Sequence, residues 1–329
     1  MPRIFAVESS CDESSIALLE DEKLIFNLVL SQTDLHSKYG GVVPEIASRR
    51  HLEVIPILLN EAVEGYGLDL DRIDAIAVTK GPGLIGALLV GITFAKSLAY
   101  VLKKPLIGVN HLIGHIYSLF LTHRDLSPPI VVLLVSGGHT ELILMKDHGN
   151  FEVLGRTLDD AAGEAFDKVA RILNLGYPGG PQIDRISKFG NPKAHRFPRA
   201  LMDGKNLDFS FSGLKTSVKY FVQKNEHFKV EDVAASFQEA VVDVLIQKSI
   251  WACEISGVMK IGVAGGVSAN SRLRKRMSEL ERDGFKVFFP SKDLCIDNAG
   301  MIARAALEKY KKGEFEELSL NAIPYLSID

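Results

Sequence analysis

Residues 130–157 read IVVLLVSGGHTELILMKDHGNFEVLGRT, and this stretch decides the fold. Its three runs rich in aliphatic residues are separated by polar turns, which predicts three consecutive strands at 130–136, 140–146 and 151–157. A helix is expected at 163–173, followed by an insertion at about 175–230. Apolar periodicity then predicts alternating helices and strands at 231–255, 260–264, 268–282, 286–289 and 298–311. The element order is therefore βββαβαβα.

The first third of the chain shows the same order. Short β-type runs occupy 3–8, 15–20 and 24–30. The expected elements that follow are at 44–65, 74–79, 84–102, 105–109 and a helix that carries His111 and His115. No repeat is visible residue by residue, so the duplication rests on element order alone. We predict two lobes, residues 1–127 and residues 128–329, the second with the insertion.

This duplicated order resembles the actin/hexokinase/Hsp70-like (ASKHA) fold, an α/β fold in which two lobes bind a nucleotide between them. The resemblance implies a phosphate loop in the first hairpin of each lobe, at residues 9–15 and 136–140. It also implies that adenosine lies against the turn at 265–270. We expect the lobes to join near residues 110–130 and a nucleotide cleft to lie between them.

Composition sets broad limits. The chain has 329 residues, 47% hydrophobic and 24% charged, which is typical of a soluble globular protein. Three cysteines, far apart and without a CxxC pair, favour a reducing, cytoplasmic location. The amino terminus lacks a signal pattern, and the apolar run at 84–95 is too short to span a bilayer, so we expect a buried helix and no membrane.

The net charge of −3 does not indicate a nucleic-acid-binding protein, but basic residues form two clusters. The clusters are Lys193, His195, Arg196 and Arg199, and then Arg272, Arg274, Lys275 and Arg276. They are either solvated helix faces or contacts for a phosphate backbone. If the ligand is a nucleic acid, we expect Arg196, Arg199, Arg272 and Arg276 to contribute to its binding.

His111 and His115 lie four residues apart on a predicted helix, so their imidazoles share one face and can hold a metal ion. A partly buried polar pair is the plainer interpretation. Because two ligands are too few for a tight site, a carboxylate is also expected. Asp297 is the best candidate, although its position before the last helix also suits a helix N-cap.

The turn Ser136-Gly137-Gly138 has bare backbone that can approach a phosphate, or it is a plain hairpin. The polar run from Glu8 to Ser15 can meet a metal-bound nucleotide, or it is a loop. Cys11 has no activating cation nearby in the sequence and is not proposed as a nucleophile. Gly180, in a rigid turn, would allow backbone to approach a ligand.

At these residues the chain resembles the tRNA N6-adenosine threonylcarbamoyltransferase family (TsaD), over essentially its whole length. The matching motifs are residues 8–15, 80–83, 111–115, 136–141, 165–168, 177–181, 208–215, 264–270 and 297–298. The resemblance implies that His111, His115 and Asp297 bind Fe²⁺ or Zn²⁺. It implies contacts with an acyl-adenylate, or with ATP or ADP analogues, from Leu134, Val135, Ser136, Gly137, Gly138, Asp167, Gly180, Asp184 and Asn270.

The same resemblance implies an acyltransferase of t6A biosynthesis. It would move a threonylcarbamoyl group from threonylcarbamoyl-AMP to N6 of adenosine 37 in tRNAs reading ANN codons, and release AMP. TsaB-like and TsaE-like (ATPase) proteins are the implied partners. Glu8 and His139 are candidates for the group that accepts the N6 proton, by position only.

Three other functions are each suggested by part of the sequence. A zinc protease of the HExxH type needs a Glu after its first His, and Leu112 occupies that position here. A small-molecule kinase of the same fold would need an Asp base at the γ-phosphate and no imidazole metal site. A nucleotide-gated interaction protein would show no transfer chemistry with all substrates present.

Overall fold

The computed structural model describes residues 1–328, which form two compact units. The first unit contains Met1–Leu126 together with the chain from Pro290 onward. The second unit is Ser127–Phe289. Each unit is built around a five-stranded sheet with its own hydrophobic core.

The first unit has the sheet order β3-β2-β1-β4-β5. Strands β1 (Arg3–Glu8), β2 (Glu13–Glu20) and β3 (Lys23–Ser31) form an antiparallel meander. Strands β4 (Ala75–Gly81) and β5 (Leu106–Asn110) continue the sheet in parallel to β1. The central residues of these parallel strands, such as Ile76 and Val78 of β4, are apolar and buried, as expected for strands covered on both faces.

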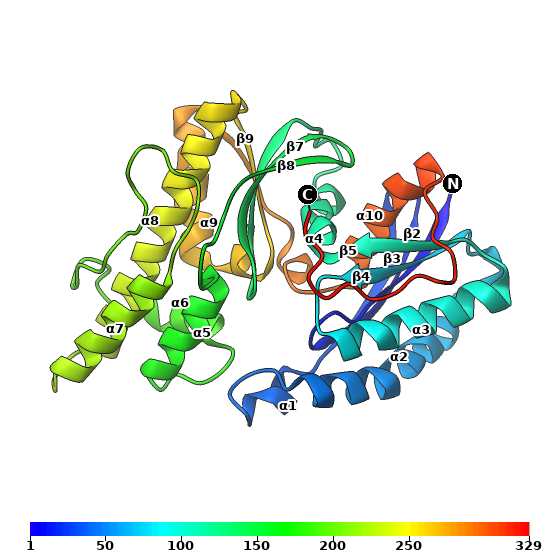
Figure 1. Cartoon of the computed structure of the whole chain (residues 1–329), viewed down its shortest axis with the longest axis horizontal. Coiled ribbons are helices and arrows are strands. Elements are labelled where there is room, and N and C mark those ends of the chain that lie inside the picture. Colours follow the sequence, from blue (N-terminus) through cyan, green and yellow to red (C-terminus); the bar gives the residue numbers. More distant parts are fainter. Residues whose placement is uncertain (329) are drawn as a thin grey trace. The chain divides into compact units, whose positions relative to one another are not determined.

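Four long helices cover this sheet. Helices α2 (Pro44–Tyr66) and α3 (Ile85–Leu102) pack together on one side, and α4 (His111–Thr122) packs with α10 (Ala299–Lys312) on the other (Figure 1). Proline begins α2 and Gly67, in the left-handed region at φ 66°, ends it. A short helix, α1 (Thr33–Ser37), precedes α2 and was not predicted.

The second unit repeats the sheet order, as β8-β7-β6-β9-β10. The strands are β6 (Ile130–Val135), β7 (Thr140–Asp147), β8 (Asn150–Arg156), β9 (Lys260–Ala264) and β10 (Lys286–Phe288). The same meander and parallel pair recur, with β6 in the place of β1 and β9 in the place of β4. The predicted duplication is therefore confirmed at the level of topology.

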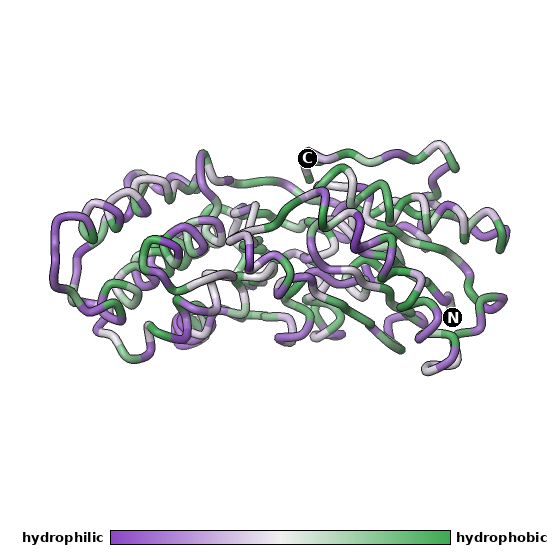
Figure 2. Tube along the Cα trace, turned by 90° about the horizontal axis from the view of Figure 1, so that it is seen from below, coloured by the Kyte–Doolittle hydropathy of each residue, from purple (hydrophilic) through white to green (hydrophobic). Residues whose placement is uncertain are grey.

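The helices of the second unit are α5 (Ala162–Ile172), α6 (Gly179–Ser187), α7 (Ser212–Lys224), α8 (Val230–Ser256) and α9 (Ser271–Glu279). Helices α6 and α7 lie in the segment expected only as an insertion. Short 3₁₀ helices complete the chain at η1 (Leu70–Arg72), η2 (Gly266–Ala269), η3 (Leu280–Asp283) and η4 (Lys292–Leu294). Along the trace, helical turns alternate between hydrophobic and hydrophilic residues, so most helices bury one face (Figure 2).

The last helix does not belong to the second unit, contrary to the expected division at residues 127 and 128. Helix α10 packs on α4 and on the first sheet instead. Gly114 makes this contact close, because a Cβ at that position would meet Ile302 Cδ1 at 2.7 Å. Sequence order placed α10 in the second lobe, but the packing surface that accepts it is on the first.

Helix α3 also differs from the expected buried helix. Among the described residues it alone is long and apolar enough to cross a membrane by length and composition, and 33% of it is buried. Its exposed apolar side chains include Leu89, at 41%, and Tyr100, at 72%. The sequence shows that this helix is apolar on all sides. It does not show that the outer face of the helix is exposed.

A buried lysine organises one loop of the second unit. Lys248 of α8 is fully buried and donates hydrogen bonds of 2.6 Å to the carbonyl oxygens of Leu201 and Asn206. The loop that it holds contains Leu201 and Lys205 at positive φ, an uncommon conformation for residues with side chains. Burial lowers the pKa of the Lys248 ammonium. The two carbonyls compensate for its desolvation.

Replacing Lys248 by Met is therefore expected to destabilise the protein by about 2–4 kcal/mol, because the carbonyls of Leu201 and Asn206 lose their donor. Urea unfolding measures the change, and limited proteolysis should cut the loop at 201–206 faster. Lys275→Met, at an exposed position on α9, is the control and should change stability by less than about 0.5 kcal/mol. Equal midpoints for the two variants would show that the ammonium does not hold the loop.

Candidate functional site

Helix α4 begins directly after strand β5, and Asn110 caps it. The Asn110 Oδ1 accepts hydrogen bonds from Leu112 N at 2.8 Å and Ile113 N at 3.4 Å. This cap places the first helical turn at His111, so His111 and His115 share one face. Their rings lie edge to face with centroids 4.7 Å apart.

Asp297 faces both imidazoles. Its Oδ1 lies 3.1 Å from His115 Nε2 and 3.5 Å from His111 Nε2. Asn298, and not Asp297, caps α10 by accepting a hydrogen bond from Met301 N at 3.0 Å. The expectation that Asp297 caps this helix is therefore wrong, and its expected role as a metal ligand stays a prediction. Its expected position in the other lobe is also wrong, because Asp297 and the histidines belong to one unit.

The three side chains suit one metal ion. The potential ligand atoms of His111, His115 and Asp297 all lie within 4.8 Å of one another. Bonds of about 2.0–2.2 Å around a tetrahedral ion separate its ligands by roughly 3.3–3.6 Å, near the observed contacts. His115 is 1% exposed, its Nε2 lies 3.1 Å from Asp297 Oδ1, and neither ring nitrogen makes a hydrogen bond to the described chain. A buried imidazole in this state fits a ligand for a cation.

Behind His111 lies a fully buried carboxylate. Glu8 Oε2 is 3.1 Å from His111 Nδ1 and accepts a hydrogen bond of 2.5 Å from Thr79 Oγ1. Glu8 Oε1 accepts a second bond of 2.5 Å from Ser10 N. Nδ1 of His111 thus faces Glu8 while Nε2 faces Asp297. This carboxylate–imidazole arrangement orients a metal ligand, and Thr79 is a member of it that sequence reasoning missed.

The charges at this site are strongly coupled. Burial alone would lower the pKa of His111, but the carboxylates of Asp297 and Glu8 outweigh it and raise that pKa well above its usual value. Burial would raise the pKa of Asp297, but the two imidazoles hold it well below its usual range. Nearby, burial together with Asp297 and Asp12 raises the pKa of Glu13. The crowded carboxylates favour a cation among them.

The loop from Ser9 to Ser15 is held from outside by α2. His51 Nε2 donates to Cys11 O at 3.0 Å, so His51 Nδ1 accepts from Ser14 Oγ at 2.7 Å. The buried His51 was not predicted, since a single histidine on a helix has no recognisable partner in sequence. Burial, together with neighbouring Asp12 and Asp297, raises the pKa of Cys11 well above its usual value. The thiol therefore stays protonated, in agreement with its exclusion as a nucleophile.

In the second unit, two loops meet at the carboxyl ends of parallel strands β6 and β9. Gly163 N donates to Ser136 O at 3.2 Å, and a Cβ on Gly265 would meet Val135 O at 2.5 Å. By contrast, a Cβ on Gly137, Gly138 or Gly266 would have nothing within 4 Å. The expected phosphate turn and adenosine turn therefore lie together in one unit, with open space over their glycines.

The remaining predicted ligand contacts surround these loops. Asp167 Oδ1 accepts a 2.7 Å bond from Gly179 N at the start of α6, and Gly180 is open. Asp184 Oδ1 accepts a 2.8 Å bond from Ser271 Oγ. Both polar atoms of the Asn270 side chain are hydrogen-bonded within the protein. Its Oδ1 caps α9 by accepting from Leu273 N, and its Nδ2 donates to Gln238 Oε1.

Three further predicted residues, Leu134, Val135 and His139, lie in β6 or in the turn that follows it. The side chains of Leu134 and Val135 are fully buried in β6, so only their backbone atoms are available to a ligand. His139 is half-buried at the end of the Ser136 turn, where its carbonyl accepts a 2.8 Å bond from Ser136 N.

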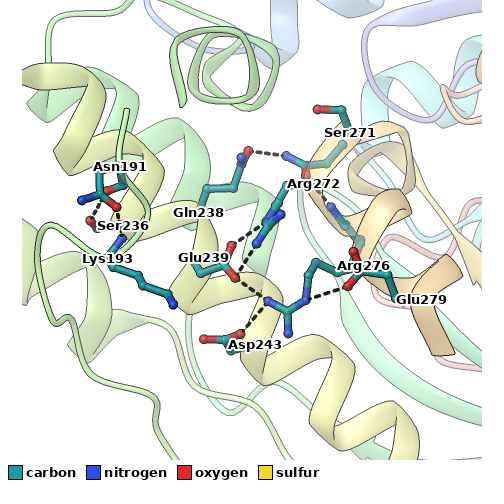
Figure 3. A network of polar contacts seen from close by, with 12 residues as sticks. Asn191, Lys193, Ser236, Gln238, Glu239, Asp243, Ser271, Arg272, Arg276 and Glu279 are labelled. Carbon is teal, nitrogen blue, oxygen red and sulfur yellow. Dashed lines mark hydrogen bonds and ion pairs between the residues drawn. The ribbon is translucent and has the colours of Figure 1, made fainter. Parts of the chain in front are cut away.

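The expected basic contacts for tRNA are mostly engaged within the protein. Arg272 forms a bidentate pair with Glu239 at 2.6 and 2.9 Å, and Arg276 contacts the same carboxylate as well as Asp243 (Figure 3). Arg199 pairs with Asp243 at 2.8 Å. These arginines balance carboxylates that tie α8 to its neighbours. Arg196 is exposed and makes no such pair in the described chain.

Comparisons with known proteins identify relatives of this chain. A relative from Kosmotoga olearia named tRNA N6-adenosine threonylcarbamoyltransferase is 56% identical over 327 residues, covering 99% of both chains. A relative of the same name from Thermosipho africanus is 54% identical over 328 residues and also covers 99% of both. The solved structure of full-length HypF has a TM-score of 0.66 at 15% identity, covering 96% of this chain and 56% of that one.

The HypF likeness supports the fold alone, and the predicted ASKHA-like architecture is confirmed. No comparison supports a kinase or a metalloprotease. The family model described as tRNA N6-adenosine threonylcarbamoyltransferase matches residues 23–304. The chain therefore belongs to the TsaD family of tRNA N6-adenosine threonylcarbamoyltransferases, the acyltransferases of t6A biosynthesis.

Proposed function

We propose that His111, His115 and Asp297 hold one Fe²⁺ or Zn²⁺ ion and that the second unit binds the threonylcarbamoyl-adenylate. The observation that carries the first proposal is the buried His115, whose ring nitrogens have no hydrogen-bond partner in the described chain beside the Asp297 carboxylate. Three protein ligands leave positions for substrate oxygens, and a bound divalent ion supplies charge for orienting or polarising them.

The adenylate site proposed in the second unit is a set of backbone approaches. Glycines at 137, 138, 180 and 266 offer N–H groups without a Cβ in the way. Asp167 would orient the start of α6, because it accepts a hydrogen bond from Gly179 N. Asp184 would orient the start of α9, because it accepts a hydrogen bond from Ser271 N. Because AMP is already a good leaving group, much of the remaining rate acceleration comes from holding the adenylate and the acceptor amine in position.

The proposed acceptor is N6 of adenosine 37 in tRNAs that read ANN codons. Of the two candidates for its proton, His139 stays proposed, since it is partly accessible beside the phosphate turn. Glu8 is proposed instead as a positioning residue, because it is fully buried and bonded to His111 and Thr79.

TsaB-like and TsaE-like partners are part of the proposal, as is a cytoplasmic location, where tRNA is found. None of the described cysteines forms a disulfide, which suits that compartment. Helices α2 and α3 lie side by side and expose Leu52, Ile57, Leu89 and Tyr100. Exposed apolar groups on paired helices are typical of a protein interface, so we assign the TsaB-like partner to this face.

Replacing His111 or His115 by Ala is expected to abolish both stoichiometric metal and threonylcarbamoyl transfer. Glu8→Gln should weaken metal binding by about 10–100-fold through loss of ligand orientation, without removing a ligand. Metal content and titration measure the binding, and nucleoside mass spectrometry measures transfer. His227→Ala, at an exposed position, is the control. Full metal content in both His variants, or full transfer after chelation, contradicts the assignment.

Gly138→Ala and Gly180→Ala are expected to weaken adenylate binding by about tenfold, equivalent to roughly 1.4 kcal/mol, at unchanged melting temperature. The new methyl groups meet no protein atom within 4 Å but would occupy the space assigned to the ligand. Gly213→Ala, equally open but on α7, is the matched control. Asn270→Ala, unlike the glycine variants, should lower the stability of the protein by about 1 kcal/mol, because it removes a helix cap. Normal adenylate affinity in both glycine variants would place the ligand elsewhere.

Ile57→Glu and Leu89→Glu are expected to weaken the complex with the TsaB-like partner at least about tenfold, since each buries a charge in an apolar interface. Co-elution in size-exclusion chromatography and titration calorimetry measure the loss, while metal and adenylate binding should persist. Phe189→Glu, which changes a side chain 81% exposed in the second unit, is the control. Undiminished assembly of both variants would exclude this face as the docking surface.

A further inference from the structure

Residues 314–328 form no helix or strand but lie along the first unit as a strap that follows α10 (Figure 1). The strap is fastened near its start, where Glu316 N donates to Leu106 O at 2.8 Å. Lys80 Nζ pairs with Glu316 Oε1, also at 2.8 Å. Further along, Leu320 is 8% exposed and belongs to the hydrophobic core of this unit. The strap is therefore an ordered part of the first unit.

The second half of the strap meets the loop that follows β4. Ile323 N donates to Lys80 O at 2.8 Å. Gly83 N donates to Pro324 O at 3.1 Å. A Cβ on Gly81 would collide with the carbonyl oxygen of Ile323, so glycine is what allows the strap to approach this loop closely.

The loop after β4 also contacts the candidate metal site. Leu84 N donates to Ser10 O at 2.8 Å. Ser10 Oγ in turn lies 3.1 Å from His111 Nδ1. One side of this loop therefore holds the strap, and the other holds a residue that touches a proposed metal ligand.

A second connection runs through Asn110, which is 8% exposed. Its Nδ2 donates to Ser327 O of the strap at 2.8 Å. Its Oδ1 accepts from Leu112 N and Ile113 N, which caps α4. A backbone carbonyl only accepts and a backbone N–H only donates, so the planar amide fits these partners in one orientation. The strap thus fixes the cap of the helix that carries both histidines.

We propose that Asn110 is a positioning residue for the metal ligands His111 and His115, and that the strap orients Asn110 through the Ser327 carbonyl. A metal ligand has to be held within about 0.5 Å of its productive position, and the groups packed behind it supply that precision. The inference rests on the proposed metal site, and it adds the segment that holds the helix of that site in place.

The test is Zn²⁺ and Co²⁺ binding by the full-length protein and by two variants. Asn110→Ser keeps an oxygen that can cap α4 but loses the N–H that reaches Ser327 O, and serine caps helices about as well as asparagine does. It is expected to bind Zn²⁺ about tenfold more weakly and to change the visible spectrum of bound Co²⁺, which reports the arrangement of the ligands. A shortened chain that ends at Ile323 lacks the Ser327 carbonyl and should show the same two changes.

Two control variants alter similar groups away from the contact. Asn225→Ser removes an amide that donates to a backbone carbonyl, that of Phe221, in the second unit. Tyr325→Ala changes a side chain of the strap that is 96% exposed and leaves the backbone of the strap intact. Both should bind Zn²⁺ and Co²⁺ as the unchanged protein does. Melting temperatures of all variants show which of them are folded.

If the unchanged protein binds neither ion, the proposed metal site fails first, and the inference with it. If the unchanged protein binds Zn²⁺ and the folded, shortened chain binds it equally well with the same Co²⁺ spectrum, the strap does not position the ligands and the inference is overturned. Should the shortened chain not fold, Asn110→Ser decides: weaker Zn²⁺ binding with an altered Co²⁺ spectrum in a folded variant supports the inference, and unchanged binding overturns it.

Discussion

The packing of α10 against α4 is the contact on which the metal-binding group depends. It brings Asp297 from near the end of the chain to His111 and His115. The start of α10 is anchored by polar groups of the first meander: Ala299 N donates to Ser15 Oγ at 2.8 Å, and Gly300 N donates to Asn27 Oδ1 at 3.0 Å. The amino-terminal N–H groups of α10 are thus satisfied by neighbouring strands, and Asp297 stays available to the imidazoles.

The two halves of the duplicated fold carry different chemistry. In the first unit, the last residue of β1, Glu8, and the polar loop that follows it lie beside the imidazoles. In the second unit, the corresponding turn after β6 is reduced to glycines with open space above them. One half therefore presents side chains that suit a cation, and the other presents the open backbone to which we assign an anion. Both functions arise at the same place in the shared topology, where parallel strands end.

Some basic side chains of this protein form ion pairs within the protein and others do not. The number of basic residues in a stretch of sequence does not show which of them are paired. The arginines near α8 and α9 were the obvious basic cluster, yet they neutralise Glu239 and Asp243. Lys219, in the predicted insertion, is exposed and has no such partner among the described residues. Carboxylates that are distant in sequence but close in space decide which cations remain for a ligand.

Much of the fold and of the site was determined by the sequence itself. Strand alternation and turn residues specified both meanders, and helical spacing specified the His111 and His115 pair, because these features depend on neighbours within a few residues. Asp297 was predicted as the third ligand from a motif. Tertiary structure alone decided that α10 joins the first unit, that Asn298 is the cap, and that Glu8 and Thr79 stand behind His111. Those outcomes depend on surfaces and hydrogen bonds formed between residues far apart in the chain, for which local patterns carry no signal.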